Sequence, residues 1–208
     1  MHKHLLATAI AVFALTPALA ADKPAKPAAA PPPPAAPAAA PAAQPPAPPP
    51  PPHSGNAELA KLDFFVGTWS CTGKAFASPM GPEHETAATV HATRSVGNAW
   101  IHVDYDETKT KANTNPIHVG VYMGYDAGAK KFVQGCVDSF GGYCTQAGSG
   151  WDGDKLVFEG TAKGSGEDMG VRDTFVKKGA KELTHSGEMQ GKDKQWMKTD
   201  EETCKRTK

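Results

Sequence analysis

From Phe64 to the C-terminus, apolar and polar residues alternate in short runs that are rich in aromatic and β-branched side chains. This period of two is typical of strands that bury one face and expose the other. Turn residues such as Asp, Gly and Asn interrupt the runs at short intervals, which favours tight hairpins between consecutive strands. We expect ten strands, at residues 64–74, 85–95, 98–107, 117–125, 130–138, 143–151, 154–161, 170–177, 181–189 and 195–206.

One segment before the first turn has a helical pattern. Leu59, Leu62 and Phe65 recur at helical spacing after Asn56, which predicts one short N-terminal helix with Asn56 as its cap. Sequential hairpins without long helices predict an all-β fold built on an antiparallel up-and-down sheet. Because a closed sheet has no unpaired edges, we expect a β-barrel of about ten strands, with a two-sheet sandwich as the alternative architecture.

A proline- and alanine-rich tract precedes these strands. Residues 24–52 contain 15 Pro, 12 Ala, Lys26 and Gln44. Proline lacks the amide donor and alanine offers little surface to bury, so this tract cannot form a packed core and is expected to favour polyproline II. We predict a disordered Pro/Ala-rich linker at residues 21–55 and one barrel domain at residues 56–208. The linker is a candidate stalk that contacts a partner in the cell envelope.

The first 20 residues have the layout of a secretory signal peptide. A short basic start that contains Lys3 precedes an apolar run at residues 5–15, and a small-x-small site at residues 18–20 ends the segment. The apolar run is shorter than the ~20 residues that span a bilayer. We therefore expect export, with the protein periplasmic or secreted and without a transmembrane span after cleavage. An uncleaved N-terminal anchor is the alternative.

The charges are balanced, with Lys+Arg 22 against Asp+Glu 22. A chain without a basic surplus has no general attraction for phosphates, so no nucleic-acid partner is expected. In an exported protein, the four cysteines predict disulfides, and four cysteines allow three pairings.

Three stretches resemble known families. Residues 62–69 (LDFFVGTW) resemble the G-x-W start of calycin barrels, which include lipocalins and fatty-acid-binding proteins. Residues 124–126 (GYD), 130–133 (KKFV) and 137–139 (VDS), with an arginine in the last strand, are similar to a bacterial family called domain of unknown function 1579. The resemblance covers the whole predicted domain. It implies a calycin-like barrel and supplies no catalytic residue.

The barrel and the resemblance together imply one cysteine pairing. In a barrel with an even number of strands, the first and last strands are antiparallel neighbours. If Cys71 on the first strand faces Cys204 on the last, Trp69 faces Arg206. Calycins commonly place an arginine of the last strand across this tryptophan, which implies a cation–π contact and structural roles for both residues. The second predicted disulfide then joins the remaining pair, Cys136 and Cys144.

Motifs of catalysis and of cofactor binding are missing from the sequence. It contains no H-E-x-x-H, G-x-S-x-G, Walker A, G-x-G-x-x-G or C-x-x-C pattern, so we predict no catalytic residue, metal ligand or cofactor. An envelope enzyme is an alternative in which His118, Asp138 and His185 converge. The row at residues 100–106 places His102 and two aspartates on one strand face, which we interpret as the solvated outer face; a hard-cation site is the alternative.

A barrel of about ten strands leaves room for a ligand, so non-enzymatic binding of a small, largely apolar molecule is the predicted function. The candidate cavity residues are Trp69, Phe132, His185, Met189 and Trp196. Haem is an alternative ligand because nitrobindin-type barrels bind haem iron through such a histidine. Those barrels carry a G-x-G-x-Y-P-T-like extension after the tryptophan, and residues 70–76 (SCTGKAF) depart from it.

Overall fold

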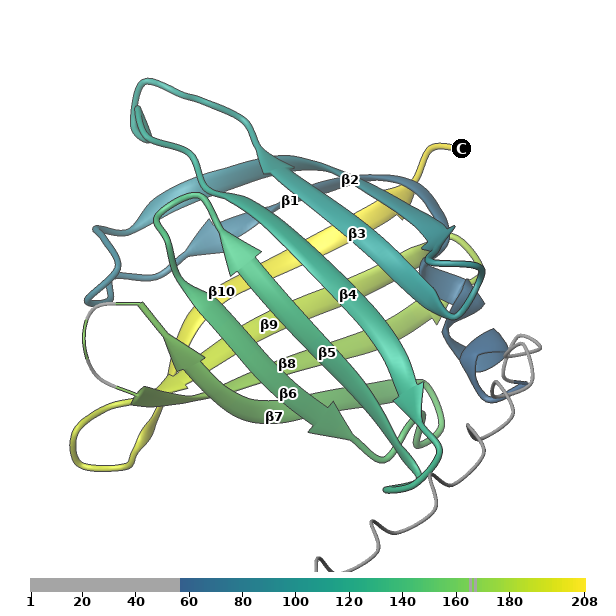
Figure 1. The fold of residues 1–208 in the computed structure, drawn as a ribbon. Helices are drawn as coiled ribbons and strands as arrows, with labels where there is room; N and C mark the ends of the chain where they lie inside the picture. The colour runs from purple at the N-terminus through teal and green to yellow at the C-terminus, as the bar shows by residue number, and fades with distance from the viewer. Residues whose placement is uncertain (1–56, 165, 167) are drawn as a thin grey trace, which may run out of the picture. The chain divides into compact units, whose positions relative to one another are not determined.

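Ten antiparallel strands form a closed barrel in the computed structural model of the protein (Figure 1). The structure describes residues 57–164, 166 and 168–208. The predicted signal peptide at 1–20, the linker at 21–55 and the Asn56 cap lie outside them. A 3-10 helix, η1 (Leu59–Phe65), precedes the strands β1 (Gly67–Ala75), β2 (His84–Ser95), β3 (Trp100–Glu107), β4 (His118–Asp126), β5 (Lys131–Asp138), β6 (Tyr143–Gly148), β7 (Lys155–Lys163), β8 (Asp168–Gly179), β9 (Glu182–Gln190) and β10 (Trp196–Arg206).

Each strand pairs with its neighbours in the sequence, and β1 pairs with β10 to close the barrel. Cys71 lies opposite Cys204 and Trp69 lies opposite Arg206 in this last pairing, which is the predicted register. Both predicted disulfides, Cys71–Cys204 and Cys136–Cys144, are present. The all-β fold, the up-and-down topology and the strand number are therefore confirmed, and the sandwich alternative is wrong.

The helix is confirmed, and its type follows from the sequence spacing. Leu59, Leu62 and Phe65 recur every third residue, and all three are buried. A 3-10 helix has three residues per turn, so these side chains line up on one face. This apolar face packs into the core at one end of the barrel, the end opposite the β1–β2 and β3–β4 loops (Figure 1).

Hydrogen bonds and ring contacts fasten η1 to the closed end of the barrel. The Trp69 indole donates to the Phe65 carbonyl at 2.8 Å, and the Trp151 indole donates to the Lys61 carbonyl at 2.8 Å. The Arg206 guanidinium lies 4.5 Å from the Trp69 ring centre and donates to the Val66 carbonyl at 3.1 Å. Trp69 and Arg206 thus join β1 to β10 and, together with η1, close one end of the barrel, which we call the floor.

Gly67, the glycine of the G-x-W pattern, is required by its backbone. Its φ is +135°, a region that side chains rarely adopt, and a Cβ there would lie 2.7 Å from the Lys208 carbonyl oxygen. The C-terminal residues therefore pack directly against the start of β1.

Among the described residues, no helix is long and apolar enough to cross a bilayer. The two disulfides are typical of an oxidising, extracytoplasmic environment.

Candidate functional site: a cavity inside the barrel

The barrel encloses a cavity of about 540 Å³ between the closed floor and the loops at the opposite end. Inward-facing residues of β2, β3, β4, β8 and β9 supply apolar walls, among them Val90, Val103, Val121, Phe175 and Leu183. They face inward because each strand alternates, so residues two apart share the lumen side. A closed sheet of ten strands is wide enough that these side chains leave space between them.

The open end of the cavity is also apolar. Phe76, Met80 and Pro82 come from the β1–β2 loop, and Phe140 comes from the β5–β6 turn. Met80 is 61% exposed and Phe140 is 55% exposed, so both present apolar surface to solvent at the mouth. Large exposed apolar side chains beside a cavity are typical of a binding site for an apolar molecule.

A charged group of residues lies inside this apolar lining. His185 of β9 has its Nε2 3.1 Å from Asp173 Oδ1 and its Nδ1 3.1 Å from Asp200 Oδ1. Both aspartates lie across from Gly187, one on each neighbouring strand. Gly187 has no side chain to occupy this space, and a Cβ there would come within 2.2 Å of Asp200 Oδ2. The glycine therefore leaves room for the Asp200 carboxylate beside the imidazole.

This arrangement changes the pKa values of the three groups. Burial alone would lower the pKa of His185, but the charges of Asp200 and Asp173 outweigh it and raise that pKa well above its ordinary value. Burial alone would raise the pKa of Asp200, but the His185 charge outweighs it and lowers that pKa. His185 keeps 21% of its side-chain surface accessible, and this surface faces the cavity. The imidazole is therefore held as a cation between two carboxylates.

Glu202 is a further carboxyl group in the lumen. It lies opposite His185 on β10, and its Oε1 accepts hydrogen bonds from Thr86 Oγ1 at 2.7 Å and from Tyr105 Oη at 2.8 Å. Burial raises the pKa of Glu202 despite these two hydrogen bonds. Burial and the nearby carboxylates also raise the pKa of Tyr105, which keeps its hydroxyl protonated as a donor.

A second polar group lies toward the open end. His84 Nε2 is 3.1 Å from Glu107 Oε1, and Asn113 Nδ2 donates to Glu107 Oε2 at 2.8 Å. A hydrogen bond with the Pro82 carbonyl and the Glu107 carboxylate raise the pKa of His84, against the opposing effect of burial. Glu107 is buried and fully engaged by these neighbours.

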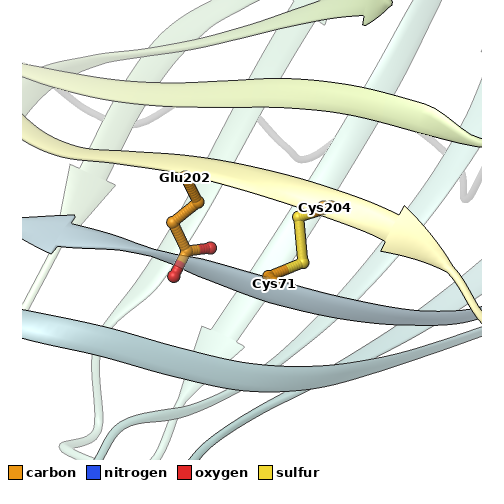
Figure 2. Close-up of side chains that lie close together, drawn as sticks. All are labelled: Cys71, Glu202 and Cys204. Atoms are coloured by element: carbon orange, nitrogen blue, oxygen red, sulfur yellow. A yellow bond between two sulfur atoms is a disulfide. The ribbon is translucent and has the colours of Figure 1, made fainter. Parts of the chain in front are cut away.

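Cys71, Glu202 and Cys204 bring three potential metal-ligand atoms within 4.8 Å of one another on β1 and β10 (Figure 2). The two sulfurs are bonded to each other, however, and a disulfide offers no thiolate to a metal ion. This group is a carboxyl packed beside a disulfide, not a metal centre.

The structure brings together only some of the predicted cavity residues. Trp69 and His185 line the cavity. Phe132 is buried in the core and makes an edge contact with Tyr125, with ring centres 5.1 Å apart. Met189 is buried between its strand partners on β8 and β10. Neither Phe132 nor Met189 borders the cavity.

Trp196 lies on the outer face, which corrects its predicted place in the cavity. Alternation from Cys204 through Glu202 would carry Trp196 inward. A β-bulge between Lys198 and Asp200 adds one residue to β10 and reverses the alternation beyond it. The Trp196 ring stacks under the Arg172 guanidinium at 3.9 Å.

The residues suggested for catalysis do not converge. His118 Nδ1 lies 2.7 Å from Asp106 Oδ1 on exposed side chains. Asp138 Oδ1 accepts from backbone amides within its own turn. Neither residue is among those that border the cavity with His185. In the row at residues 100–106, the His102 ring stacks on Tyr122 with centres 4.4 Å apart, and the two aspartates are exposed.

The haem alternative also does not fit the residues. An axial histidine needs a free nitrogen lone pair that points to the iron. Both nitrogens of His185 lie 3.1 Å from carboxylate oxygens, and the raised pKa keeps both protonated. His185 in this arrangement is a cation held between two carboxylates, not an iron ligand.

Sequence reasoning missed Asp173, Asp200, Glu202 and Gln134 as cavity residues. Tyr105 lies on the strand face opposite to the row that was predicted to be solvated, and its side chain borders the cavity. For three of these residues the signal was their position in the alternation. Glu202 and Asp200 lie an even number of residues from Cys204, and Asp173 lies two residues from Phe175. A polar residue at such a position is equally compatible with a side chain that faces solvent, so the alternation alone did not identify these residues as part of the cavity.

Comparison with known proteins agrees with this architecture. The model of a family described as "Protein of unknown function (DUF1579)" matches residues 55–206. The chain belongs to this family. The crystal structure of Rv2717c from M. tuberculosis is similar, with a TM-score of 0.56 and 14% sequence identity, over 74% of this chain and 99% of that chain. At this identity the likeness shows a shared barrel fold. No functionally curated protein matches the chain.

Proposed function

We propose that this DUF1579 protein is an exported, non-enzymatic binding protein that holds a small, largely apolar molecule inside the barrel. The observation that carries the proposal is the cavity of about 540 Å³ with apolar walls and an apolar mouth. Ligand pockets in proteins are typically of this size, with mainly apolar linings and a few polar groups. Asp173, His185 and Glu202 are among the polar groups here.

The affinity of such a site comes mainly from the apolar surface that the ligand removes from water. Each methylene that enters the cavity stabilises the complex by about 0.8 kcal/mol, which is about fourfold in Kd. The dye Nile red, which is neutral and fluoresces strongly in apolar surroundings, serves as the reporter. We expect it to bind the full-length protein, and we expect 1-octanol, 1-decanol and 1-dodecanol to displace it with rising affinity.

Two tryptophan substitutions locate the binding. Val121 lines the cavity on β4, whereas Val137 on β5 is exposed on the outer face. Val121→Trp fills part of the lumen and should weaken dye binding at least tenfold, while Val137→Trp should leave it unchanged. Absence of dye and alcohol binding, or equal loss in both variants, would reject a binding function for the lumen.

Export is the second part of the proposal. The layout of residues 1–20 and the two disulfides support it. N-terminal sequencing of the protein from the cell envelope should give Ala21 as the first residue, and retention of Met1 would favour an anchored form. In the exported protein, residues 21–55 serve as a stalk, and the domain at 56–208 binds the ligand.

A further inference from the structure

Acidic side chains outnumber basic side chains in the lining of the cavity. Four of the lining side chains are carboxyl groups, and two are imidazoles; no lysine or arginine is among the described residues that border the lumen. The histidines are already engaged, His185 by two aspartates and His84 by Glu107. The protein therefore offers no free cation inside the barrel to receive an anionic ligand.

Glu202 is the carboxyl group with capacity left. Both of its hydrogen bonds, from Thr86 and Tyr105, end on Oε1, and Oε2 accepts neither. Thr86 and Tyr105 come from β2 and β3 and hold the carboxyl in place from the neighbouring wall. Glu202 is therefore a fixed acceptor in the lumen. Burial raises its pKa, against the hydrogen bonds from Thr86 and Tyr105 and the charge of His185.

A second, independent acceptor is Gln134 of β5. Its side chain borders the cavity and is only 5% exposed. Its Nε2 donates across the lumen to Asp173 Oδ2 at 2.8 Å and also to Gln146 Oε1, which fixes the orientation of the amide. The Gln134 Oε1 atom is buried and has no hydrogen-bond partner in the described part of the chain. A buried carbonyl without a donor is costly, and a ligand that brings a donor removes the cost.

We propose that the ligand is an amphiphilic amine, an apolar body that carries an ammonium group, and that Glu202 and Gln134 receive this group inside the barrel. The inference rests on the proposed binding function and names the chemistry of its ligand. An ammonium brings positive charge and three N–H donors, which match the carboxylate of Glu202 and the unpaired carbonyl of Gln134. A fatty carboxylate brings like charge and no donor, so the same cavity disfavours it.

Three ligands of one chain length separate head group from tail: dodecylamine, 1-dodecanol and dodecanoic acid. At neutral pH the amine is an ammonium and the acid is a carboxylate. Displacement of Nile red from the full-length protein gives the three affinities. We expect the amine to bind at least tenfold more tightly than the acid, with the alcohol between them.

Two glutamine variants assign the preference to the lumen. Glu202→Gln removes the cavity carboxylate, and Glu188→Gln removes one carboxylate from the outer face, where Glu188 pairs with Arg172 at 3.2 Å. Both change the net charge equally. We expect Glu202→Gln to reduce the amine-to-acid preference at least fivefold, and Glu188→Gln to preserve the preference.

Alcohol binding separates the two proposals. If 1-dodecanol binds and the acid binds as well as the amine, the ammonium inference is wrong while the binding function stands. Equal effects of the two glutamine variants would likewise overturn it, because the preference would then come from overall charge. If none of the three ligands binds, both proposals are rejected.

Discussion

The two disulfides should differ in their effect on stability, because they close loops of very different length. Cys71–Cys204 joins the first and last strands with a sequence separation of 133 residues, whereas Cys136–Cys144 spans 8 residues within one hairpin. Loop-closure entropy predicts a contribution of about 5 kcal/mol for the long loop and about 2.5 kcal/mol for the short one. The predicted difference between the bridges is therefore about 2.5 kcal/mol.

Two double variants measure this difference: Cys71→Ala with Cys204→Ala, and Cys136→Ala with Cys144→Ala. Each removes one bridge and leaves the other as an internal control. Chemical denaturation of the full-length protein gives the free energy of unfolding and its dependence on denaturant, the m-value. The first variant should lose about twice the free energy lost by the second. Its m-value should also rise more, because its unfolded chain is released from a longer loop and exposes more surface.

Equal losses in the two variants would refute this reasoning. A larger loss for the Cys136–Cys144 variant would do so more strongly. Either result would mean that local packing at the sulfurs, and not constraint of the unfolded chain, sets the contribution of these bridges.

Three further predictions concern the floor and the charged cluster. Leu62→Ala should destabilise the protein by about 2–5 kcal/mol in chemical denaturation, since the side chain is fully buried under the floor, whereas exposed Lys61→Ala should change stability by less than about 0.5 kcal/mol. Gly187→Ala should push the Asp200 carboxylate away, cost about 1–3 kcal/mol and lower the pKa of the adjacent histidine in an NMR titration; an unchanged histidine pKa would contradict the assigned contact. Because the pKa of Glu202 is raised in the folded state, the stability of the wild-type protein falls as the pH rises through the folded-state pKa. Glu202→Gln removes this fall. The variant should therefore be more stable than the wild type at neutral pH but not near pH ~4. A constant difference across this pH range would show that the carboxyl is not the titrating group.

The local sequence pattern was sufficient to predict the strands. Alternation predicted ten strands whose bounds agree closely with those of the structure. Placing Cys71 opposite Cys204 predicted that Trp69 lies opposite Arg206, as it does. The strand pattern depends on steps of two along one strand and on hairpins between neighbours, which short stretches of sequence encode. The pairing of β1 with β10 joins segments far apart in the chain, and its prediction rested on barrel closure, the cysteines and the calycin resemblance together.

The contents of the lumen were decided by the tertiary structure. Gln134 reaches Asp173 between β5 and β8, which are not neighbours in the sheet, and Tyr105 of β3 reaches Glu202 of β10. Such contacts exist only after the barrel has closed, because closure alone determines which strands face one another.

The bulge in β10 shows the same limit in a single strand. One extra residue between Lys198 and Asp200 placed Trp196 outside the barrel. The sequence by itself determined a sheet of ten alternating strands and the pairing that joins its two ends. Which acidic side chains meet inside, around His185, was left to the tertiary structure, because an acidic residue in an alternating strand has the same local pattern whether it faces water or the lumen.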